Sequence, residues 1–145
     1  MRSIQITRVF DAPRPVVFRY WSDPRKLEQW SGCKDSTGCA VEMDFRVGGA
    51  FTQKMQIAGH GEFSIKGTYE EIVEPERISY RVDLGFAVTR VMIEFFEEAG
   101  DRTRVVLDQD GFPDQFLCDT VSQGTTESFE NLAALFASAG VAARS

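Results

Sequence analysis

The chain has 145 residues, of which 43% are hydrophobic and 26% are charged, a composition typical of a folded globular protein. This length suits one domain, residues 1–145, with a core large enough to fold without disulfides or metals. Sixteen basic and twenty-two acidic residues give a net charge of -6. Because that charge repels phosphate backbones, we expect no nucleic-acid partner.

The N-terminus lacks an apolar signal segment, and no run approaches the length of about twenty apolar residues that a membrane-spanning helix needs. We therefore expect a cytoplasmic protein that does not insert into a membrane. The three cysteines fit a reducing compartment, since an odd number argues against a secreted disulfide framework.

Residues 3–10 alternate apolar and polar side chains and predict a half-buried strand. Two short helices should follow. Asp11 is a candidate cap for the first, with Pro13 and Pro15 suited to its first turn. The second should be capped by Ser22 or Asp23.

From residue 41 the apolar period changes to two, which predicts six further strands separated by short turns rich in glycine. The expected strands cover residues 41–47, 51–57, 63–73, 78–84, 91–95 and 103–107. Together with the first strand they make seven. Short connections favour antiparallel neighbours, and a strongly twisted sheet of this size should curve.

Residues 111–140 contain the one long helical pattern. Its apolar positions recur at a spacing of three to four: Val121, Thr125, Phe129, Leu132 and Phe136. This face should pack on the concave side of the antiparallel sheet. The sequence thus predicts an α+β fold in which the curved sheet wraps around the C-terminal helix and leaves a hollow between them.

Several short motifs occur in an order that resembles a known family. They are Thr7-Arg8-Val9-Phe10-Asp11-Ala12-Pro13, Trp21-Ser22-Asp23-Pro24, Leu27 with Trp30, Gly67-Thr68-Tyr69-Glu70-Glu71-Ile72 before Pro75-Glu76-Arg77-Ile78, Thr103-Arg104-Val105 before Gly111-Phe112, and Gly124 with Leu132 and Leu135. The chain resembles the SRPBCC superfamily, which includes START domains and the Bet v 1 group, and within it the family named for the C-terminal domain of the activator of heat-shock-protein-90 ATPase. The resemblance implies the helix-grip fold.

One position departs from that family. After the helix-opening glycine the family usually has tryptophan, and this chain has Thr125. If Thr125 faces the sheet, the vacated space should be on the order of a hundred cubic ångströms. The alternative is that Phe112, Phe116 or Phe129 fills it, as close packing would favour.

We expect a binding protein that holds a small hydrophobic or amphipathic molecule between the sheet and the helix. The predicted binding residues are Met43, Phe45, Met55, Phe63, Tyr69, Tyr80, Phe95, Leu107, Gln109, Thr125, Phe129 and Leu132. Tyr69, Tyr80 and Gln109 could orient a ligand or, alternatively, be ordinary core residues. The two methionines would make the wall adaptable and the site promiscuous. Trp21 and Trp30 are interpreted as core anchors of the short helices.

The resemblance implies two alternative functions. The family's namesake contacts a chaperone ATPase, although it carries an additional N-terminal domain that we expect this chain to lack. Other relatives in the superfamily are enzymes such as polyketide cyclases. An open edge strand could also pair with a second copy of the chain to form a homodimer.

Candidate catalytic groups are few, and we assign no catalytic residue, metal or cofactor. His60 stands between glycines and is expected to be a solvated turn residue, although a histidine in a cleft could act as a base. Cys33, Cys39, His60 and Cys118 could bind zinc only with an unusual spacing. Adjacent carboxylates, such as Glu70 and Glu71, point to opposite faces of a strand. Asp108 and Asp110 supply too few oxygens for calcium.

Overall fold

The computed structural model describes residues 2–30, 36–57 and 61–144. In chain order the elements are β1 (Arg2–Phe10), α1 (Arg14–Ser22), α2 (Pro24–Trp30), β2 (Ser36–Met43), β3 (Ala50–Ile57), β4 (Gly61–Val73), β5 (Arg77–Asp83), β6 (Val88–Glu98), β7 (Arg102–Phe112) and α3 (Gln115–Arg144). The predicted order of a strand, two short helices, six strands and a long helix is confirmed.

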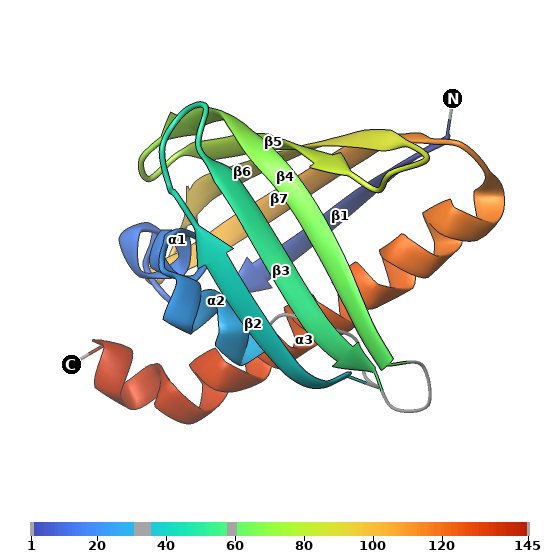
Figure 1. Cartoon of the computed structure of the whole chain (residues 1–145). Helices are drawn as coiled ribbons and strands as arrows, with labels where there is room; N and C mark the ends of the chain where they lie inside the picture. The colour runs from blue at the N-terminus through green and yellow to red at the C-terminus, as the bar shows by residue number, and fades with distance from the viewer. Residues whose placement is uncertain (1, 31–35, 58–60, 145) are drawn as a thin grey trace.

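The seven strands form one antiparallel sheet in the order β1-β7-β6-β5-β4-β3-β2. Strands β2 to β7 follow each other as a meander, and β1 adds to β7, so that β1 and β2 are the two edges. The sheet curves, and α3 runs across its concave side, while α1 and α2 lie at one end (Figure 1). This is the helix-grip fold, as predicted.

The strand predicted over residues 41–47 is displaced. In the structure β2 ends at Met43, and a tight turn follows in which the Arg46 amide donates to the Asp44 carbonyl and the Gly49 amide to the Arg46 carbonyl, both at 2.8 Å. Gly48 has a φ of +84°, a conformation that glycine adopts without strain. Val47, the last residue of the predicted strand, is 62% exposed.

The starts of the short helices differ in how they are capped. Helix α1 begins after Pro13 and has no side-chain cap, so the prediction of Asp11 as its cap was wrong. Proline there needs no amide partner, and its fixed φ already suits the first turn. In α2 the Asp23 carboxylate accepts a hydrogen bond from the Arg25 amide at 2.9 Å, which confirms one of the two predicted caps.

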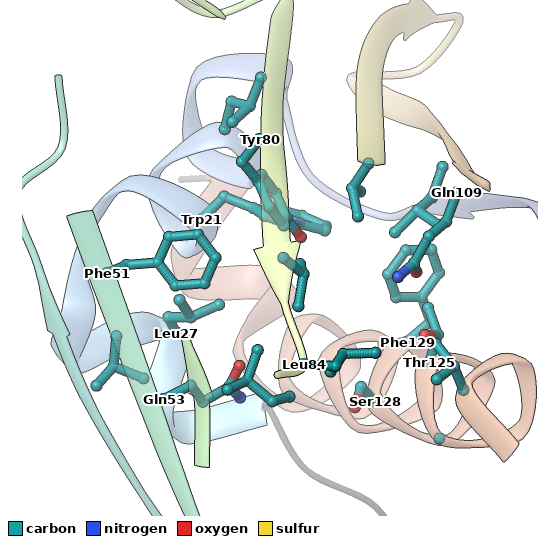
Figure 2. Close-up of a pocket in the computed structure, with 18 of the residues that line it drawn as sticks. Trp21, Leu27, Phe51, Gln53, Tyr80, Leu84, Gln109, Thr125, Ser128 and Phe129 are labelled. Carbon is teal, nitrogen blue, oxygen red and sulfur yellow. The ribbon is translucent and has the colours of Figure 1, made fainter. Parts of the chain in front are cut away.

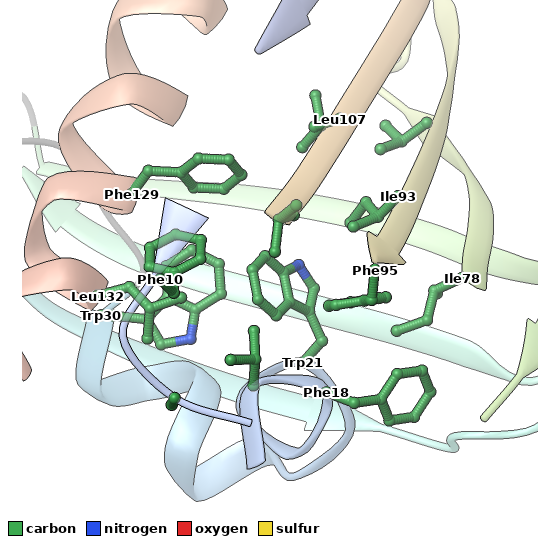
Figure 3. Close-up of a cluster of buried hydrophobic side chains, with 14 of the residues drawn as sticks. Phe10, Phe18, Trp21, Trp30, Ile78, Ile93, Phe95, Leu107, Phe129 and Leu132 are labelled. Atoms are coloured by element: carbon green, nitrogen blue, oxygen red, sulfur yellow. The ribbon is translucent and has the colours of Figure 1, made fainter. Parts of the chain in front are cut away.

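A dense aromatic cluster fills the end of the molecule where α1, α2 and the second half of α3 meet the sheet (Figure 3). The ring of Trp21 lies 4.7 Å from Trp30, 5.2 Å from Phe95 and 5.9 Å from Phe129, measured between centroids. Phe10 lies 5.6 Å from Phe129 with the rings edge to face, an arrangement that aromatic pairs prefer. The core is therefore concentrated at this end.

Helix α3 is fixed mainly by its second half. Phe129, Leu132 and Phe136 are buried, and the helix packs against β1, β7 and α2. The Asn131 amide also donates to the Trp30 carbonyl at 3.3 Å. Among the residues described, no helix is both long and apolar enough to cross a bilayer.

Candidate ligand cavity

A cavity of about 390 Å³ lies between the concave face of the sheet and the first half of α3 (Figure 2). The short helices contribute Trp21, Leu27 and Trp30 to its wall. Strands β2 to β4 contribute Val41, Phe51, Gln53, Ile65 and Tyr69. Most of these groups are apolar, and small-molecule sites have such linings.

The sequence of α3 explains why side chains leave this space unfilled. Where the helix passes over the cavity its lining residues are mostly small: Thr120, Val121, Gly124, Thr125 and Ser128, with Leu117 before them. A Cβ atom added to Gly124 would meet nothing within 4 Å. Phe129 borders the cavity at the point where the bulky residues of the helix begin. The change from small to bulky side chains along this face of α3 therefore determines where the densely packed core ends and the cavity begins.

Strand alternation builds the opposite wall. On β5 and just after it, Ile78, Tyr80, Val82 and Leu84 all face the cavity, and each is separated from the next by two positions. Strands β6 and β7 add Val91, Leu107 and Gln109. Because alternate residues of a strand share one face, the whole inner surface is set by the period of two.

The Tyr69 and Tyr80 rings lie side by side on this wall, 6.0 Å apart between centroids. The ring of Phe51 packs against both, at 5.2 Å from each. Burial raises the pKa of both tyrosines above the ordinary value, and the neighbouring Tyr80 adds to the increase for Tyr69. Both phenols thus remain neutral at physiological pH.

Two polar groups have defined positions at the cavity. The side-chain amide nitrogen of Gln109 donates to the Thr89 hydroxyl at 3.0 Å, and both residues are buried. The Tyr80 hydroxyl points into the open space (Figure 2). By contrast, the Tyr69 hydroxyl is directed at the Met43 sulfur, 4.0 Å away. Tyr80 and Gln109 can therefore offer hydrogen bonds to a guest.

The structure brings together six of the residues predicted for the site. Tyr69, Tyr80, Leu107, Gln109, Thr125 and Phe129 line the cavity. None of the three phenylalanines considered fills the space beside Thr125. Phe116 is 80% exposed, Phe112 is buried without lining the cavity, and Phe129 borders the cavity and leaves it open.

Four other predicted residues lie elsewhere. Met43, Phe45, Phe95 and Leu132 are not part of the cavity wall. Phe95 and Leu132 are enclosed in the core, and Phe45 packs on Phe18 at 6.0 Å and on Tyr69 at 5.1 Å. The side chains of Met55 and Phe63 lie outside the part of the chain that the structure describes. The expectation of an adaptable methionine wall thus has no support from Met43.

Sequence reasoning missed much of the wall. Trp21 and Trp30 were interpreted only as core anchors, but each has one side in the aromatic cluster and another at the cavity. Val82, Leu84 and Val91 could have been found, because they continue the alternation of Tyr80 and its neighbours. Phe51 and Gln53 alternate on β3 in the same way.

Where the structure describes them, the remaining candidates for chemistry do not form a second site. Glu70 pairs with Arg81 at 3.5 Å, and Glu71 with Arg77 at 3.0 Å. A register shift between Tyr69 and Glu71 puts both carboxylates on the outer face of the sheet, so the prediction that they point to opposite faces was wrong. The Asp108 carboxylate accepts a hydrogen bond from Gln5 at 2.8 Å. Within the residues described, no group of three or more His, Cys, Asp or Glu side chains could hold a metal ion. His60, Cys33 and the Cys39 side chain lie outside the described residues.

Solved structures share this architecture. CV1439 from Chromobacterium violaceum is 27% identical with a TM-score of 0.80, over 93% of this chain and 97% of that chain. A protein from Arthrobacter aurescens is 22% identical with a TM-score of 0.81, over 94% and 87% of the two chains. PFC0360w from Plasmodium falciparum, described as an HSP90 activator, is 22% identical with a TM-score of 0.74, over 94% and 97%.

A search of curated proteins gives no match. The family model described as "Activator of Hsp90 ATPase homolog 1-like protein" matches residues 11–137, which include almost every element from α1 to α3. The fold agrees with this match, since a sheet that grips a C-terminal helix is also the architecture of the superfamily that the sequence resembles. The chain therefore belongs to the family of activator of Hsp90 ATPase homolog 1-like proteins, within the SRPBCC superfamily.

Proposed function

We propose that this protein binds a small hydrophobic or amphipathic molecule in the cavity between the sheet and α3. The observation that carries the proposal is a cavity of about 390 Å³, partly open to solvent, with a mainly apolar wall. Sites for small molecules have volumes of roughly 300–1,000 Å³ and a few placed polar groups within an apolar lining. Tyr80 and Gln109 would be those polar groups.

The location of the cavity supports the proposal that it is a binding site and not a defect in the packing of the core. Protein interiors are normally packed as densely as organic crystals. In the aromatic cluster the Trp21 ring lies in contact with its neighbours, 5.2 Å from Phe95 and 5.9 Å from Phe129 between centroids. The same helix that packs densely through Leu132 and Phe136 carries small residues over the cavity. A guest would supply the van der Waals contacts that the empty wall lacks.

The wall also restricts the shape of the guest. Aromatic rings and branched aliphatic side chains make up most of it, and these groups have few rotamers. Phe51, Tyr69 and Tyr80 hold one another in place. We therefore expect selectivity for rigid molecules rather than the promiscuity that a methionine-rich wall would give.

The test is a thermal-unfolding screen with lipids and aromatic metabolites, combined with native mass spectrometry of gently purified protein. A ligand at a hundred times its Kd should raise the free energy of unfolding by about 2.7 kcal/mol. The matched control is Thr125→Trp, which places a large ring in the cavity and should abolish the shift while the protein remains folded. Absence of a shift with every compound, and of any retained molecule, would contradict the proposal. The same mass spectra report whether the chain forms a dimer.

A second candidate function is activation of an Hsp90 ATPase, which family membership favours. PFC0360w, with the same fold, is described as an HSP90 activator. The ATPase rate of Hsp90 from the same organism, measured with and without this protein, decides the question. An unchanged rate at saturating protein would exclude this candidate and would leave the ligand proposal untouched.

A further inference from the structure

The described side chains that line the cavity are all uncharged at neutral pH. None of its described side chains is Asp, Glu, Lys, Arg or His, although 26% of the chain is charged. The charged residues of the same strands point to the outer face, where Arg81 pairs with Glu70 and Arg77 with Glu71. A charged guest would lose its hydration without gaining a counter-ion, which costs several kilocalories per mole.

Tyr80 is placed to donate one hydrogen bond to a guest. Its ring is fixed between Phe51 and Tyr69, at centroid distances of 5.2 and 6.0 Å, and its hydroxyl projects into the space (Figure 2). A phenol held in an apolar site stays protonated and is a strong donor to a carbonyl oxygen.

Gln109 is placed to accept one hydrogen bond from a guest. Its amide nitrogen donates one of its two hydrogens to the buried Thr89 hydroxyl at 3.0 Å, and in the structure this bond orients the amide group. The carbonyl oxygen of that amide remains for a guest. Gln109 and Thr125 lie on one side of the cavity in Figure 2 and Phe51 on the other, with Tyr80 between them.

We infer that the natural ligand is an uncharged, rigid, mainly apolar molecule whose polar groups are a carbonyl-type oxygen for Tyr80 and a hydroxyl or amine hydrogen for Gln109. The inference rests on the proposed binding function and defines its ligand class. Fatty acids, acyl phosphates and other anions fall outside this class. Neutral aromatic ketones, phenols and quinone-like compounds fall within it.

Four naphthalene probes of similar size separate the contributions of hydrogen bonding, apolar contact and charge to binding. The probe 2-acetylnaphthalene carries a hydrogen-bond acceptor, and 2-naphthol carries a donor. The probe 2-ethylnaphthalene is a hydrocarbon, and 2-naphthoate is an anion. Calorimetric titration at pH 7.5 should give 2-naphthoate an affinity at least about a hundredfold below that of 2-acetylnaphthalene. As the pH falls, the affinity for 2-naphthoate should rise by about tenfold per pH unit, since only the neutral acid would enter.

Variants assign the two polar contacts. Tyr80→Phe removes one oxygen and keeps the ring, and it should weaken 2-acetylnaphthalene by roughly 3- to 10-fold while leaving 2-ethylnaphthalene unchanged. The double variant Thr89→Val with Gln109→Met removes both partners of the buried hydrogen bond, so that neither is left unpaired. It should weaken 2-naphthol by a similar factor and spare the hydrocarbon.

The outcomes distinguish this inference from the function on which it rests. If 2-naphthoate binds as tightly as the ketone, or if Tyr80→Phe weakens all four probes equally, the ligand class is wrong and the binding function stands. If none of the probes binds, and Thr125→Trp behaves like the unmodified protein in the wider ligand screen, then the binding function and the ligand class fail together.

Discussion

At the scale of single residues, Tyr80 connects the fold to the proposed chemistry. Its position on the inner face follows from strand alternation, and its ring is held by two aromatic neighbours. The same burial that makes it a neutral donor raises the pKa of its hydroxyl. A residue that serves the cavity should therefore also influence how stability depends on pH.

The first prediction concerns that dependence. In the unfolded chain Tyr80 ionises near its ordinary pKa of 10.0, whereas burial raises the pKa in the folded protein. The folded state thus retains its proton when the unfolded state has lost it. The contribution of Tyr80 is fully present below pH 10 and is lost as the pH rises through the folded pKa, so the free energy of unfolding should fall above pH 10.

Urea unfolding of the wild type and of Tyr80→Phe between pH 8 and pH 11 measures the effect. The variant should lose less stability over this range, because one of the two buried phenols with a raised pKa is gone. Tyr69→Phe is the matched comparison, since burial raises the pKa of Tyr69 for the same reason. If the free energy of unfolding falls equally with pH in the wild type and in both variants, neither phenol is sequestered from water.

At the scale of elements, two glycines illustrate opposite kinds of packing. Gly67 in β4 lies under the ring of Phe51, and a Cβ added there would clash with that ring and with the Arg81 carbonyl oxygen. Gly124 in α3 faces open space. Strand β4 is therefore closely packed at Gly67, whereas α3 is not closely packed at Gly124.

The second prediction compares alanine at these two positions. Gly67→Ala should lower the free energy of unfolding by about 1–3 kcal/mol, because Phe51 must move from its place on the cavity wall. Gly124→Ala should raise it by about 0.5–1 kcal/mol, since alanine favours the helix and meets no obstacle. Chemical denaturation of both variants provides the measurement. If Gly124→Ala proves as destabilising as Gly67→Ala, the space beneath α3 is not open.

The elements also show what sequence patterns can and cannot determine. Alternation and helical spacing identified every described strand and helix, because each has one buried face. The end of β2 was missed because the residues after Met43 keep an alternating pattern while their backbone forms a turn through local hydrogen bonds. The start of α1 was misassigned to an Asp11 cap because proline can begin a helix without one.

At the scale of the whole molecule, the cavity results from an unequal distribution of bulk between its two ends. The threonine at position 125 was the one indication of a vacancy that the sequence contained, and Thr125 does line the cavity. The sequence could not show that Phe95 and Leu132 belong to the dense end and not to the cavity, since both share the expected inner face. Which inner residues touch a space depends on sheet curvature and on the path of α3, which no local pattern encodes.

The third prediction follows from that unequal distribution. The second half of α3 is anchored by Phe129, Leu132 and Phe136, whereas the first half covers the cavity with small side chains. Segments with few buried apolar contacts open at lower free energy than the core. Amides of residues 117–125 should therefore exchange with deuterium faster than those of residues 129–136.

A bound ligand should change the rate of hydrogen exchange differently in the two halves of α3. A molecule that fills the cavity supplies the first half with the contacts it lacks, so exchange there should slow on addition of a compound selected by the unfolding screen. The second half, already packed, should change little. Thr125→Trp provides the control, because its ring should slow exchange of the first half without any ligand. Uniform protection along α3, with or without the compound, would mean that the helix opens as one unit and that the cavity does not determine its local stability.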